Sequence, residues 1–305
     1  MNIIRRWHSS EQYFTHQTSG STGTPKKIKI SRSKIVSSAK ATLSSIDPEN
    51  QIKTSLLCIS AAHIGGAMVV YRSLIFEHDL TIVAPSASPM DELGGEAFDL
   101  VSFVPMQFNK LSPTDLNCFR TVLIGGAPIE VRKVKTTAKI YSTFGMTETV
   151  SHIALRPIGE ELFTTTGDTK VAIGDEGGLM INGSITDNKW LKTNDLVSII
   201  SNNSFKWIGR MDFVINSGGL KIHPEKVEQQ LSDKVKGDIM ISSLPDGQLG
   251  SKVILLSSGQ EEAIDFGELE KYQAPKACYF NQQIFKTSSG KLDRLKTQEH
   301  FKNTL

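Results

Sequence analysis

The sequence is poor in cysteine and carries no surplus of charge. Its 305 residues include only three cysteines, Cys58, Cys118 and Cys278, which stand far apart and without CxxC spacing. This scarcity argues against a disulfide framework or a zinc site and suits a reducing, cytoplasmic environment. The 34 basic and 32 acidic residues leave a formal charge of +2. Because there is no basic field, we do not expect the chain to bind nucleic acid.

Long hydrophobic runs are also missing. The most apolar stretch, LLCISAAHIGGAMVVYRSLIF, is interrupted by His63 and Arg72, so it predicts a buried strand, a turn and a helix rather than membrane insertion. No apolar run follows the arginines of MNIIRRWHSSEQ, and we expect no signal peptide. The composition, with 39% hydrophobic residues, is that of an ordinary globular protein, and the length suggests two domains.

The first half of the chain alternates short apolar runs with helical patterns. Continuous apolar strands separated by helices are typical of a parallel sheet buried on both faces, so residues 1 to about 150 predict an α/β layer. Ser31 is placed to cap the first long helix. The expected strands are residues 28–30, 55–60, 80–85, 100–105, 121–126 and 138–145, and the expected helices are residues 32–43, 64–77, 107–112 and 129–136.

The pattern changes twice further along. Residues 150–211 contain short alternating strands with frequent turns, which predict a small antiparallel β-subdomain or barrel. From residue 212 we expect a compact α+β unit, so the predicted fold is α/β with a large domain 1–211 and a small domain 212–305. The small domain is expected to hold a hairpin around Ser217–Gly219, helices at 224–235, 261–272 and 291–301, and strands at 238–244, 251–258 and 277–285.

One stretch near the N-terminus is unsuited to a core. QTSGSTGTPK, residues 17–26, holds two glycines and five hydroxyl side chains. Exposed backbone N–H groups and small hydroxyls commonly cradle phosphate, and Lys26 adds a point charge suited to it. The Walker pattern is excluded, because Pro25 stands where that loop needs its second glycine. On composition alone, a flexible surface turn is the alternative interpretation.

The segment TSGSTGTPK resembles the phosphate-loop signature of the adenylate-forming superfamily, which comprises acyl- and aryl-CoA ligases, luciferases and peptide-synthetase adenylation domains. Further segments resemble that family's motifs in the same order along the chain. They are GGAP at 125–128, FGMTE at 144–148, TND at 193–195, GRMDFVINSGGLKIHPEKVE at 209–228 and SSGKLDR at 288–294. The resemblance implies the adenylate-forming fold, with a mobile C-terminal domain.

It also implies a reaction in two steps. The carboxylate of an acid attacks the α-phosphate of ATP, which gives an acyl-adenylate and pyrophosphate, and the thiol of coenzyme A then displaces AMP. Magnesium would assist at the phosphates. Two anions must meet in the first step, so cations and oriented dipoles have to offset their repulsion. The implied cofactors and partners are therefore ATP, Mg2+, coenzyme A and a small carboxylic acid.

The resemblance assigns roles to the motif residues. Thr147 would bind the α-phosphate and Glu148 would hold Mg2+, and Asp195 and Arg210 would bind the ribose. Lys291 would neutralise charge during adenylation. The remaining residues would hold the phosphates with Lys26 (Thr18, Ser19, Gly20, Ser21, Thr22, Gly23, Thr24), line the adenine site (Gly125, Gly126, Ala127, Phe144, Gly145, Met146), form the domain hinge (Asp212) and line the coenzyme A tunnel (Gly218, Gly219).

Two departures and several structural alternatives accompany these roles. Phe144 stands where the family more often has Tyr, and Asn194 where it has Gly. Taken alone, the glycines at 125–126 would be a strand-ending turn, Asp195 a turn cap and Lys291 a solvated helix start. The motif context favours the functional interpretation of all three.

The acid is suggested by two segments. FDLVSFVPMQFNKL at 98–111 resembles the corresponding stretch of o-succinylbenzoate–CoA ligases, the menaquinone-pathway members of the family. Their substrate carries a second carboxylate, and Arg72, on the apolar helix MVVYRSLIF, could bind it in bidentate fashion. A surface arginine or a structural ion pair is the alternative. His63 would stand at the mouth of the acyl pocket, unless it is simply a packed histidine at a strand end.

Three functions remain open on the sequence. The leading one is an o-succinylbenzoate–CoA ligase, the second a ligase for another aryl or short acyl acid, and the third an inactive relative that serves as a binding module. Family members usually carry more than a hundred residues before the phosphate loop, and here 17 residues precede it. We therefore expect an exposed flank, unless short segments or a partner subunit in a homo-oligomer cover it.

Overall fold

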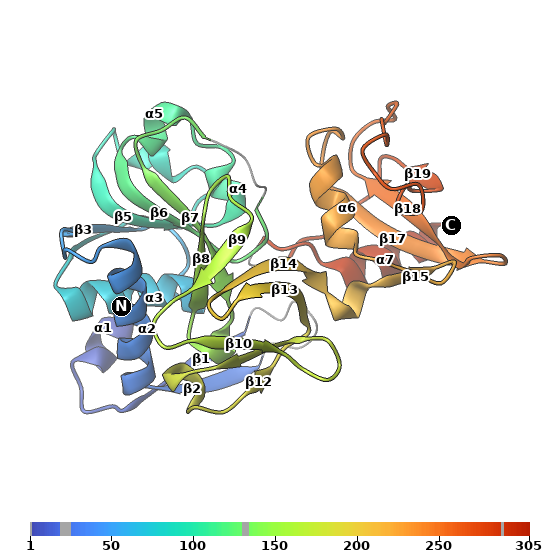
Figure 1. Ribbon diagram of the computed structural model, residues 1–305. Helices are drawn as coiled ribbons and strands as arrows, with labels where there is room; N and C mark the ends of the chain where they lie inside the picture. The colour runs from blue at the N-terminus through green and yellow to red at the C-terminus, as the bar shows by residue number, and fades with distance from the viewer. Residues whose placement is uncertain (1, 19–25, 130–133, 288–289) are drawn as a thin grey trace. The chain divides into compact units, whose positions relative to one another are not determined.

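The computed structural model describes residues 2–18, 26–129, 134–287 and 290–305 (Figure 1). Its α helices are α1 (Asn2–Trp7), α2 (Arg32–Ile46), α3 (Ile64–Phe76), α4 (Pro105–Phe108), α5 (Pro113–Leu116), α6 (Pro224–Leu231) and α7 (Arg294–Thr304). The short 3-10 helices are η1 (Pro89–Glu92), η2 (Thr147–Thr149), η3 (Ser184–Thr186) and η4 (Met211–Phe213).

The strands mix parallel and antiparallel pairing, which confirms the predicted α/β class. They are β1 (Tyr13–Gln17), β2 (Lys27–Ser31), β3 (Thr54–Leu57), β4 (Asp79–Ile82), β5 (Phe98–Phe103), β6 (Phe119–Ile124), β7 (Lys139–Gly145), β8 (His152–Pro157), β9 (Leu162–Thr165), β10 (Lys170–Ile173), β11 (Leu179–Asn182), β12 (Leu191–Lys192), β13 (Asp195–Ser201), β14 (Ser204–Arg210), β15 (Ile215–Ser217), β16 (Leu220–Ile222), β17 (Ile239–Asp246), β18 (Gly250–Ser257) and β19 (Ala277–Tyr279).

A nine-stranded sheet organises the first part of the chain, in the order β13-β14-β9-β8-β7-β6-β5-β3-β4. Strands β4, β3, β5, β6 and β7 pair in parallel, as the apolar runs predicted. Parallel strands end at the same edge of a sheet, so the loops after β3, β5, β6 and β7 lie along one edge. Helix α2 begins where expected, because the hydroxyl of Ser31 accepts the Lys34 N–H at 3.3 Å.

The expected separate β-subdomain is wrong in its extent. Strands β8 and β9 continue the large sheet through antiparallel pairing with β7 and with each other, and β14 pairs with β9. Three strands, β10, β11 and β12, form a small sheet of their own. An alternating pattern identifies a strand but not the strand with which it pairs. In β8 the five residues from His152 onward are all buried, as expected for a strand inside a sheet.

The N-terminal segment packs against one side of α3. The Trp7 ring lies 5.3 Å from that of Tyr71 on α3 and 5.6 Å from that of Phe14 on β1. The Arg32 guanidinium stacks 4.3 Å over Trp7 and donates to its carbonyl at 2.9 Å. Phe14 and Tyr71 are each only 1% exposed. Residues of the chain itself therefore shield this side of α3.

By its internal contacts the chain divides into two compact units. The first comprises Met1–Ala172, Met180–Leu191 and Ile199–Lys206, and the second comprises Ile173–Leu179, Lys192–Ser198 and Trp207–Leu305. The predicted small domain, residues 212–305, falls wholly within the second unit. A boundary and hinge at residue 212 remains a prediction.

The second unit contains most of the elements predicted for it. Strands β15 and β16 form the expected hairpin, with Gly218 and Gly219 at φ values of 57° and 79° in its turn. Pro224 opens α6, and β17 pairs antiparallel with β18, whose other neighbour is the parallel β19. Buried side chains from these elements, among them Ile222, Val227 and Leu255, form one core.

Several predicted boundaries were wrong. Residues 261–272 are not helical, because Gly267 interrupts them and its N–H is taken by Asp265 Oδ1 at 2.8 Å. The strand predicted at 277–285 ends at Tyr279, and α7 begins at Arg294 rather than Lys291. The helix predicted at 107–112 is replaced by the short helices α4 and α5. The helix predicted at 129–136 includes residues 130–133, which lie outside the described residues.

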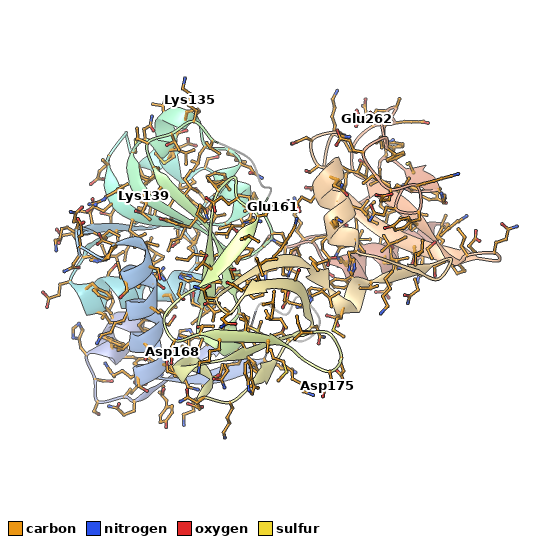
Figure 2. The ribbon with its side chains drawn as sticks, viewed as in Figure 1. Lys135, Lys139, Glu161, Asp168, Asp175 and Glu262 are labelled. Carbon is orange, nitrogen blue, oxygen red and sulfur yellow. The ribbon has the colours of Figure 1, made fainter. Side chains whose placement is uncertain are left out.

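The surface bears charges of both signs. Exposed Lys135, Lys139, Glu161 and Asp168 lie on the first unit (Figure 2). This mixture agrees with the nearly neutral composition. No helix in the described part of the chain is long and apolar enough to cross a bilayer.

Candidate active site

The ends of the phosphate loop are held by a strand pair. Strands β1 and β2 run antiparallel, and Gln17 pairs with Lys27. Beyond this pair, the Thr18 N–H donates to the Lys26 carbonyl and the Lys26 N–H to Thr18 Oγ1, both at 2.9 Å. Lys26 is exposed. The other predicted phosphate-binding residues, Ser19, Gly20, Ser21, Thr22, Gly23 and Thr24, lie outside the described residues.

His63 lies beside the base of this loop. Gln17 forms an isolated parallel bridge with His63, which sits after β3 at the N-terminus of α3. The His63 side chain is half-buried, and its Nδ1 is buried without a hydrogen-bond partner among the described residues. The strand pair that carries the predicted phosphate loop therefore meets His63 at the edge of the large sheet where β3 ends.

The GGAP segment follows β6 at that edge. The Gly125 N–H donates to the Phe103 carbonyl at 3.1 Å, and a Cβ on Gly125 would lie 2.5 Å from Thr143 Oγ1. Gly126 has a φ of 94°, which L-residues rarely adopt. Both positions therefore favour glycine, Gly125 for lack of space and Gly126 for its backbone conformation. The next residue, Ala127, is half-buried. The segment is a turn that ends β6, and Gly126 is exposed. This turn is compatible with the adenine-site interpretation and with the purely structural one.

The FGMTE segment begins in the last two residues of β7 and continues into the next loop along the edge. The pairing of β7 with β8 shifts between Phe144 and Gly145, where a Cβ on the glycine would lie 2.0 Å from the Ser151 carbonyl oxygen. The Phe144 ring is half-buried and packs edge-on against Phe205 at 5.3 Å. Thr149 stabilises the turn.

In that turn the Met146 N–H donates to Thr149 Oγ1 at 3.1 Å, and Thr149 in turn donates to the Ser151 carbonyl at 2.8 Å. Thr147 is 7% exposed, whereas Glu148 is exposed. The turn therefore presents the carboxylate of Glu148 to solvent and keeps Thr147 close to the sheet.

Magnesium fits this arrangement as an ion carried by nucleotide. The described residues contain no group of three or more His, Cys, Asp or Glu side chains that could enclose a metal. Mg2+ is commonly held by one or two carboxylates together with substrate phosphates, and an accessible Glu148 provides one such ligand.

A second cluster lies in the second unit, around Asp195. This carboxylate is 6% exposed and accepts a hydrogen bond from Trp207 Nε1 at 3.0 Å. Arg210 Nη1 lies 3.8 Å from its Oδ2. Burial raises the pKa of Asp195, although the Trp207 bond and the Arg210 charge act against this. Trp207 was not among the predicted site residues, because only the fold brings its indole to the aspartate.

Asp212, the predicted hinge residue, is held from two sides. Arg210 Nε donates to its Oδ2 at 3.2 Å, and Asn194 Nδ2 donates to its Oδ1 at 2.7 Å. Asn194 is the residue that departs from the family's glycine. The amide therefore supplies a hydrogen bond to Asp212 that a glycine could not make.

Lys291 stands on a tight hairpin in front of α7. Lys286 bridges to Leu292, the Thr287 N–H donates to the Lys291 carbonyl at 2.8 Å, and the Lys291 N–H donates to Thr287 Oγ1 at 3.2 Å. Asp293 caps α7 by accepting from the Lys296 N–H at 3.1 Å. The structural alternative, in which Lys291 begins a helix, is therefore wrong, because α7 begins three residues later at Arg294.

Arg72 lies inside the first unit. Its side chain is 2% exposed, and its Nε and Nη1 find no hydrogen-bond partner in the described ranges. Burial lowers its pKa to about 10. The interpretation as a surface arginine is wrong, and no acidic residue pairs with it in the part of the chain that the structure describes.

Buried polar groups that the sequence did not single out accompany Arg72. His152 on β8 is 8% exposed, and its Nε2 lies 2.8 Å from Thr42 Oγ1 on α2. Burial and, to a smaller degree, the Arg72 charge lower the His152 pKa to about 3. The hydroxyl of Ser38, one turn before Thr42, is buried without a partner among the described residues. A polar interior of this kind suits a polar ligand group.

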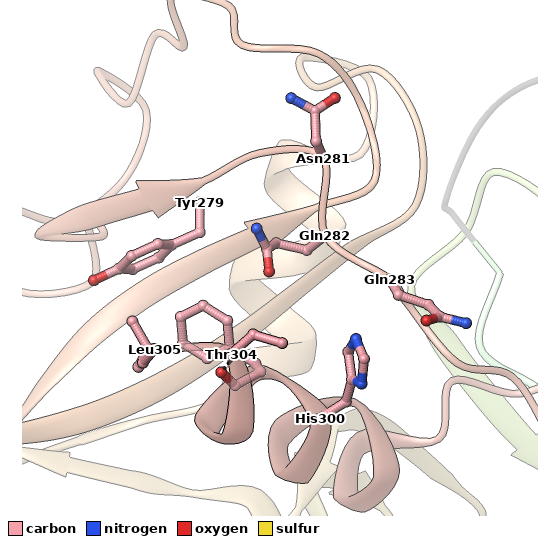
Figure 3. A pocket seen from close by; sticks show the side chains of 8 residues that line it. Tyr279, Asn281, Gln282, Gln283, His300, Thr304 and Leu305 are labelled. Atoms are coloured by element: carbon pink, nitrogen blue, oxygen red, sulfur yellow. Dashed lines mark hydrogen bonds between the residues drawn. The ribbon is translucent and has the colours of Figure 1, made fainter.

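A hollow elsewhere in the second unit has a different character. It encloses about 460 Å³ between β19 and the end of α7 (Figure 3). Amides and an imidazole dominate its lining, which consists of Tyr279, Asn281, Gln282, Gln283, His300, Phe301, Thr304 and Leu305. None of the predicted site residues belongs to it, so we do not assign the reaction to this hollow.

Comparisons with known proteins agree with the motifs. The sequence profile described as AMP-binding enzyme matches residues 6–179. The 2-succinylbenzoate–CoA ligase of Listeria monocytogenes is 26% identical over 97% of this chain and 72% of its own length.

Two solved structures have the same fold. The acyl-CoA synthetase (AMP-forming)/AMP-acid ligase II-like protein of Dyadobacter fermentans is 30% identical, with a TM-score of 0.63, over 98% of this chain and 92% of that one. The o-succinylbenzoate coenzyme A synthetase of Bacillus subtilis, solved with ATP and a magnesium ion, is 21% identical with a TM-score of 0.76 over 93% of this chain and 69% of that one. The chain therefore belongs to the AMP-binding enzyme family, whose acid–CoA ligases use ATP, Mg2+ and coenzyme A.

Proposed function

We propose that this protein is an ATP-dependent acid–CoA ligase that converts o-succinylbenzoate to o-succinylbenzoyl-CoA. The family membership supports the ligase chemistry, and relatives such as the Listeria enzyme bear the name of this activity. The observation that carries the choice of acid is the buried guanidinium of Arg72, whose Nε and Nη1 have no hydrogen-bond partner among the described residues.

The motif residues would each contribute to the first step. Thr147 and the phosphate loop with Lys26 would bind the phosphates, and Glu148 would hold the Mg2+ that clamps them. Asp195 would accept the ribose hydroxyls. It is already buried and oriented by Trp207, so little reorganisation is needed on binding. Lys291 would offset the negative charge as the carboxylate approaches the α-phosphate.

The second carboxylate of o-succinylbenzoate would be the partner that Arg72 lacks. An unpaired buried charge is costly, and a carboxylate that accepts two hydrogen bonds from the guanidinium offsets that cost. His152 would remain neutral because its pKa is about 3, so it adds no second positive charge near Arg72. A simple monocarboxylic acid would leave Arg72 unpaired, and this difference is the basis of the proposed specificity.

ATP–pyrophosphate exchange across a panel of acids tests both parts of the proposal. We expect exchange with o-succinylbenzoate, and we expect Arg72→Ala to raise its KM roughly 10- to 100-fold, the value of one or two charge-assisted hydrogen bonds. The rate of exchange with a monocarboxylate such as benzoate should not fall in this variant. Arg120→Ala removes an exposed arginine at the start of β6 and is the matched control.

The outcomes separate the three functions. An unchanged KM for o-succinylbenzoate in Arg72→Ala contradicts the carboxylate clamp. Exchange with monocarboxylates alone favours a ligase for another acid, and exchange with no acid favours a binding module.

A further inference from the structure

A buried charge cluster in the second unit has no part in the proposed site. Arg294, the last residue of the SSGKLDR motif, forms an ion pair with Glu228, and its Nε lies 4.0 Å from Glu225 Oε1. The three side chains are only 11%, 15% and 9% exposed. Desolvation makes such a cluster a poor source of stability, since well-packed apolar residues commonly do as well or better. Its geometric role is therefore of more interest.

The cluster joins four segments of the unit. Glu225 and Glu228 stand one turn apart on α6, and Glu228 Oε1 accepts the Ile241 N–H of β17 at 2.7 Å. Arg294 also donates to the Ile241 carbonyl at 3.3 Å, and its guanidinium lies 5.1 Å over the ring of Phe213. Phe213 directly follows Asp212. The start of α7 is thus tied to α6, to β17 and to the predicted hinge segment.

The hairpin that carries Lys291 is attached to the same end of α7. The Asp293 N–H donates to the Phe285 carbonyl at 2.8 Å, and the Phe285 N–H donates to Thr297 Oγ1 at 3.0 Å. Thr297 is fully buried, and Arg294 follows Lys291 by only three residues. Any shift of the α7 N-terminus would therefore move the hairpin.

We propose that Arg294, held by Glu228 and Glu225, is a positioning residue that sets the place of Lys291 for adenylation. The inference rests on the proposed function of Lys291 and extends it. Arg294 does not touch the substrate. It fixes the first turn of α7 against α6 and the hinge segment, so that the hairpin presents Lys291 in one place when this unit meets the nucleotide. Adenylation depends on this placement, and thioester formation, which does not use Lys291, should depend on it far less.

The test measures the two half-reactions separately in folded variants. ATP–pyrophosphate exchange with o-succinylbenzoate reports adenylation, and isolated o-succinylbenzoyl adenylate with coenzyme A reports thioester formation. In Arg294→Met we expect the exchange kcat to fall roughly 10- to 100-fold, as misplacing a catalytic group by about 1 Å would do. The KM for ATP and the rate of thioester formation should stay close to those of the unaltered enzyme, and Arg294→Lys should recover part of the kcat.

Two further variants separate positioning from loss of folding. Glu228→Gln/Arg294→Met removes two of the three charges, leaves only Glu225, and keeps an acceptor for the Ile241 N–H, so it should regain part of the thermal stability lost in Arg294→Met without regaining exchange. Lys302→Met, on an exposed position of α7, is the matched control and should behave like the unaltered enzyme.

An exchange kcat that is unchanged in folded Arg294→Met, or an equal fall in both half-reactions, overturns the inference. Lys291→Ala is measured in parallel. If that variant retains full exchange, the proposed role of Lys291 itself fails, and the result is distinguishable from a failure of the Arg294 inference alone.

Discussion

The side chains that distinguish this protein at the residue scale are polar groups inside the first unit. Thr42 donates its single hydroxyl proton to the Ser38 carbonyl at 2.9 Å. It can therefore only accept from His152, whose Nε2 must carry the proton. The fold thus sets both the tautomer and, through burial, the neutral state of this histidine. The charge of Arg72 lies close enough to lower the His152 pKa. The Nε and Nη1 of Arg72 have no hydrogen-bond partner among the described residues, so an anion would stabilise it.

This burial predicts an acid sensitivity. The His152 pKa is about 3 in the folded protein against 6.5 for a free histidine, so between these values only the unfolded chain binds the proton. Its contribution to the free energy of unfolding is complete above pH 6.5 and is lost as the pH falls. The loss from pH 7 to 5 is about 2 kcal/mol.

We expect His152→Gln to lose less stability than the unaltered protein between pH 7 and 5, measured by urea unfolding at both values. His8→Gln, at an exposed position, should follow the unaltered protein. Identical acid-induced losses in His152→Gln and the unaltered protein would show that His152 is not buried in its neutral form.

At the scale of elements, the loop between β3 and α3 is closely packed against the first turn of the helix. A Cβ on Gly66 would lie 2.4 Å from the Ser60 carbonyl oxygen, whereas a Cβ on Gly65 would meet only the side chain of Ile59, at 3.9 Å. The two glycines are neighbours in the first turn of α3. The close approach at Gly66 holds the helix against the loop that carries His63.

Substitution of Gly66 and of Gly65 by alanine should have different effects on stability. Gly66→Ala should lower the free energy of unfolding by about 1–3 kcal/mol, because the backbone of the loop must move. Gly65→Ala should be neutral or raise it by up to about 1 kcal/mol, through the better helix propensity of alanine. Chemical denaturation of both variants checks this. Equal effects of the two substitutions would mean that the loop does not pack on α3 as described.

The elements also show which structures sequence patterns can predict and which they cannot. The strands of the parallel sheet were predictable because most of them contain a short apolar run, as in β5 and β6. The apolar residues of 261–272 were mistaken for a helical face. Ile264, Phe266 and Leu269 do pack on the core of the second unit, but from irregular turns. A helix and a string of turns can bury the same side chains, and only the surroundings decide between them.

At the scale of the whole molecule, the predicted roles are divided between two units. The phosphate loop, the GGAP turn and the FGMTE turn belong to the first unit, and Asp195, Arg210 and Lys291 belong to the second. The family resemblance implies that the C-terminal part turns about Asp212, offering Lys291 for adenylation and the hairpin at Gly218 for thioester formation.

Lys291→Ala should therefore separate the half-reactions. Adenylate formation should fall roughly 100- to 1000-fold, as when one preorganised charge partner of a transition state is removed. Conversion of supplied acyl-adenylate to thioester should be unaffected. The control is Lys286→Ala, which removes an exposed ion pair with Asp238 from the same hairpin and should change neither rate appreciably. Equal loss of both half-reactions in Lys291→Ala would contradict the alternation.

The sequence by itself determined the family, the strands of the parallel sheet and the candidate nucleotide residues, because each of these is a local pattern. Each depends on a few adjacent residues whose backbone conformation and chemistry can be read together, as with Gly125 and Gly126. The tertiary structure alone decided that Arg72 is buried with no acidic partner in the described part of the chain, that Asn194 binds Asp212, and that Arg294 pairs with Glu228, 66 residues away. Burial and pairing of charges depend on segments distant in sequence, and only the fold brings such segments together.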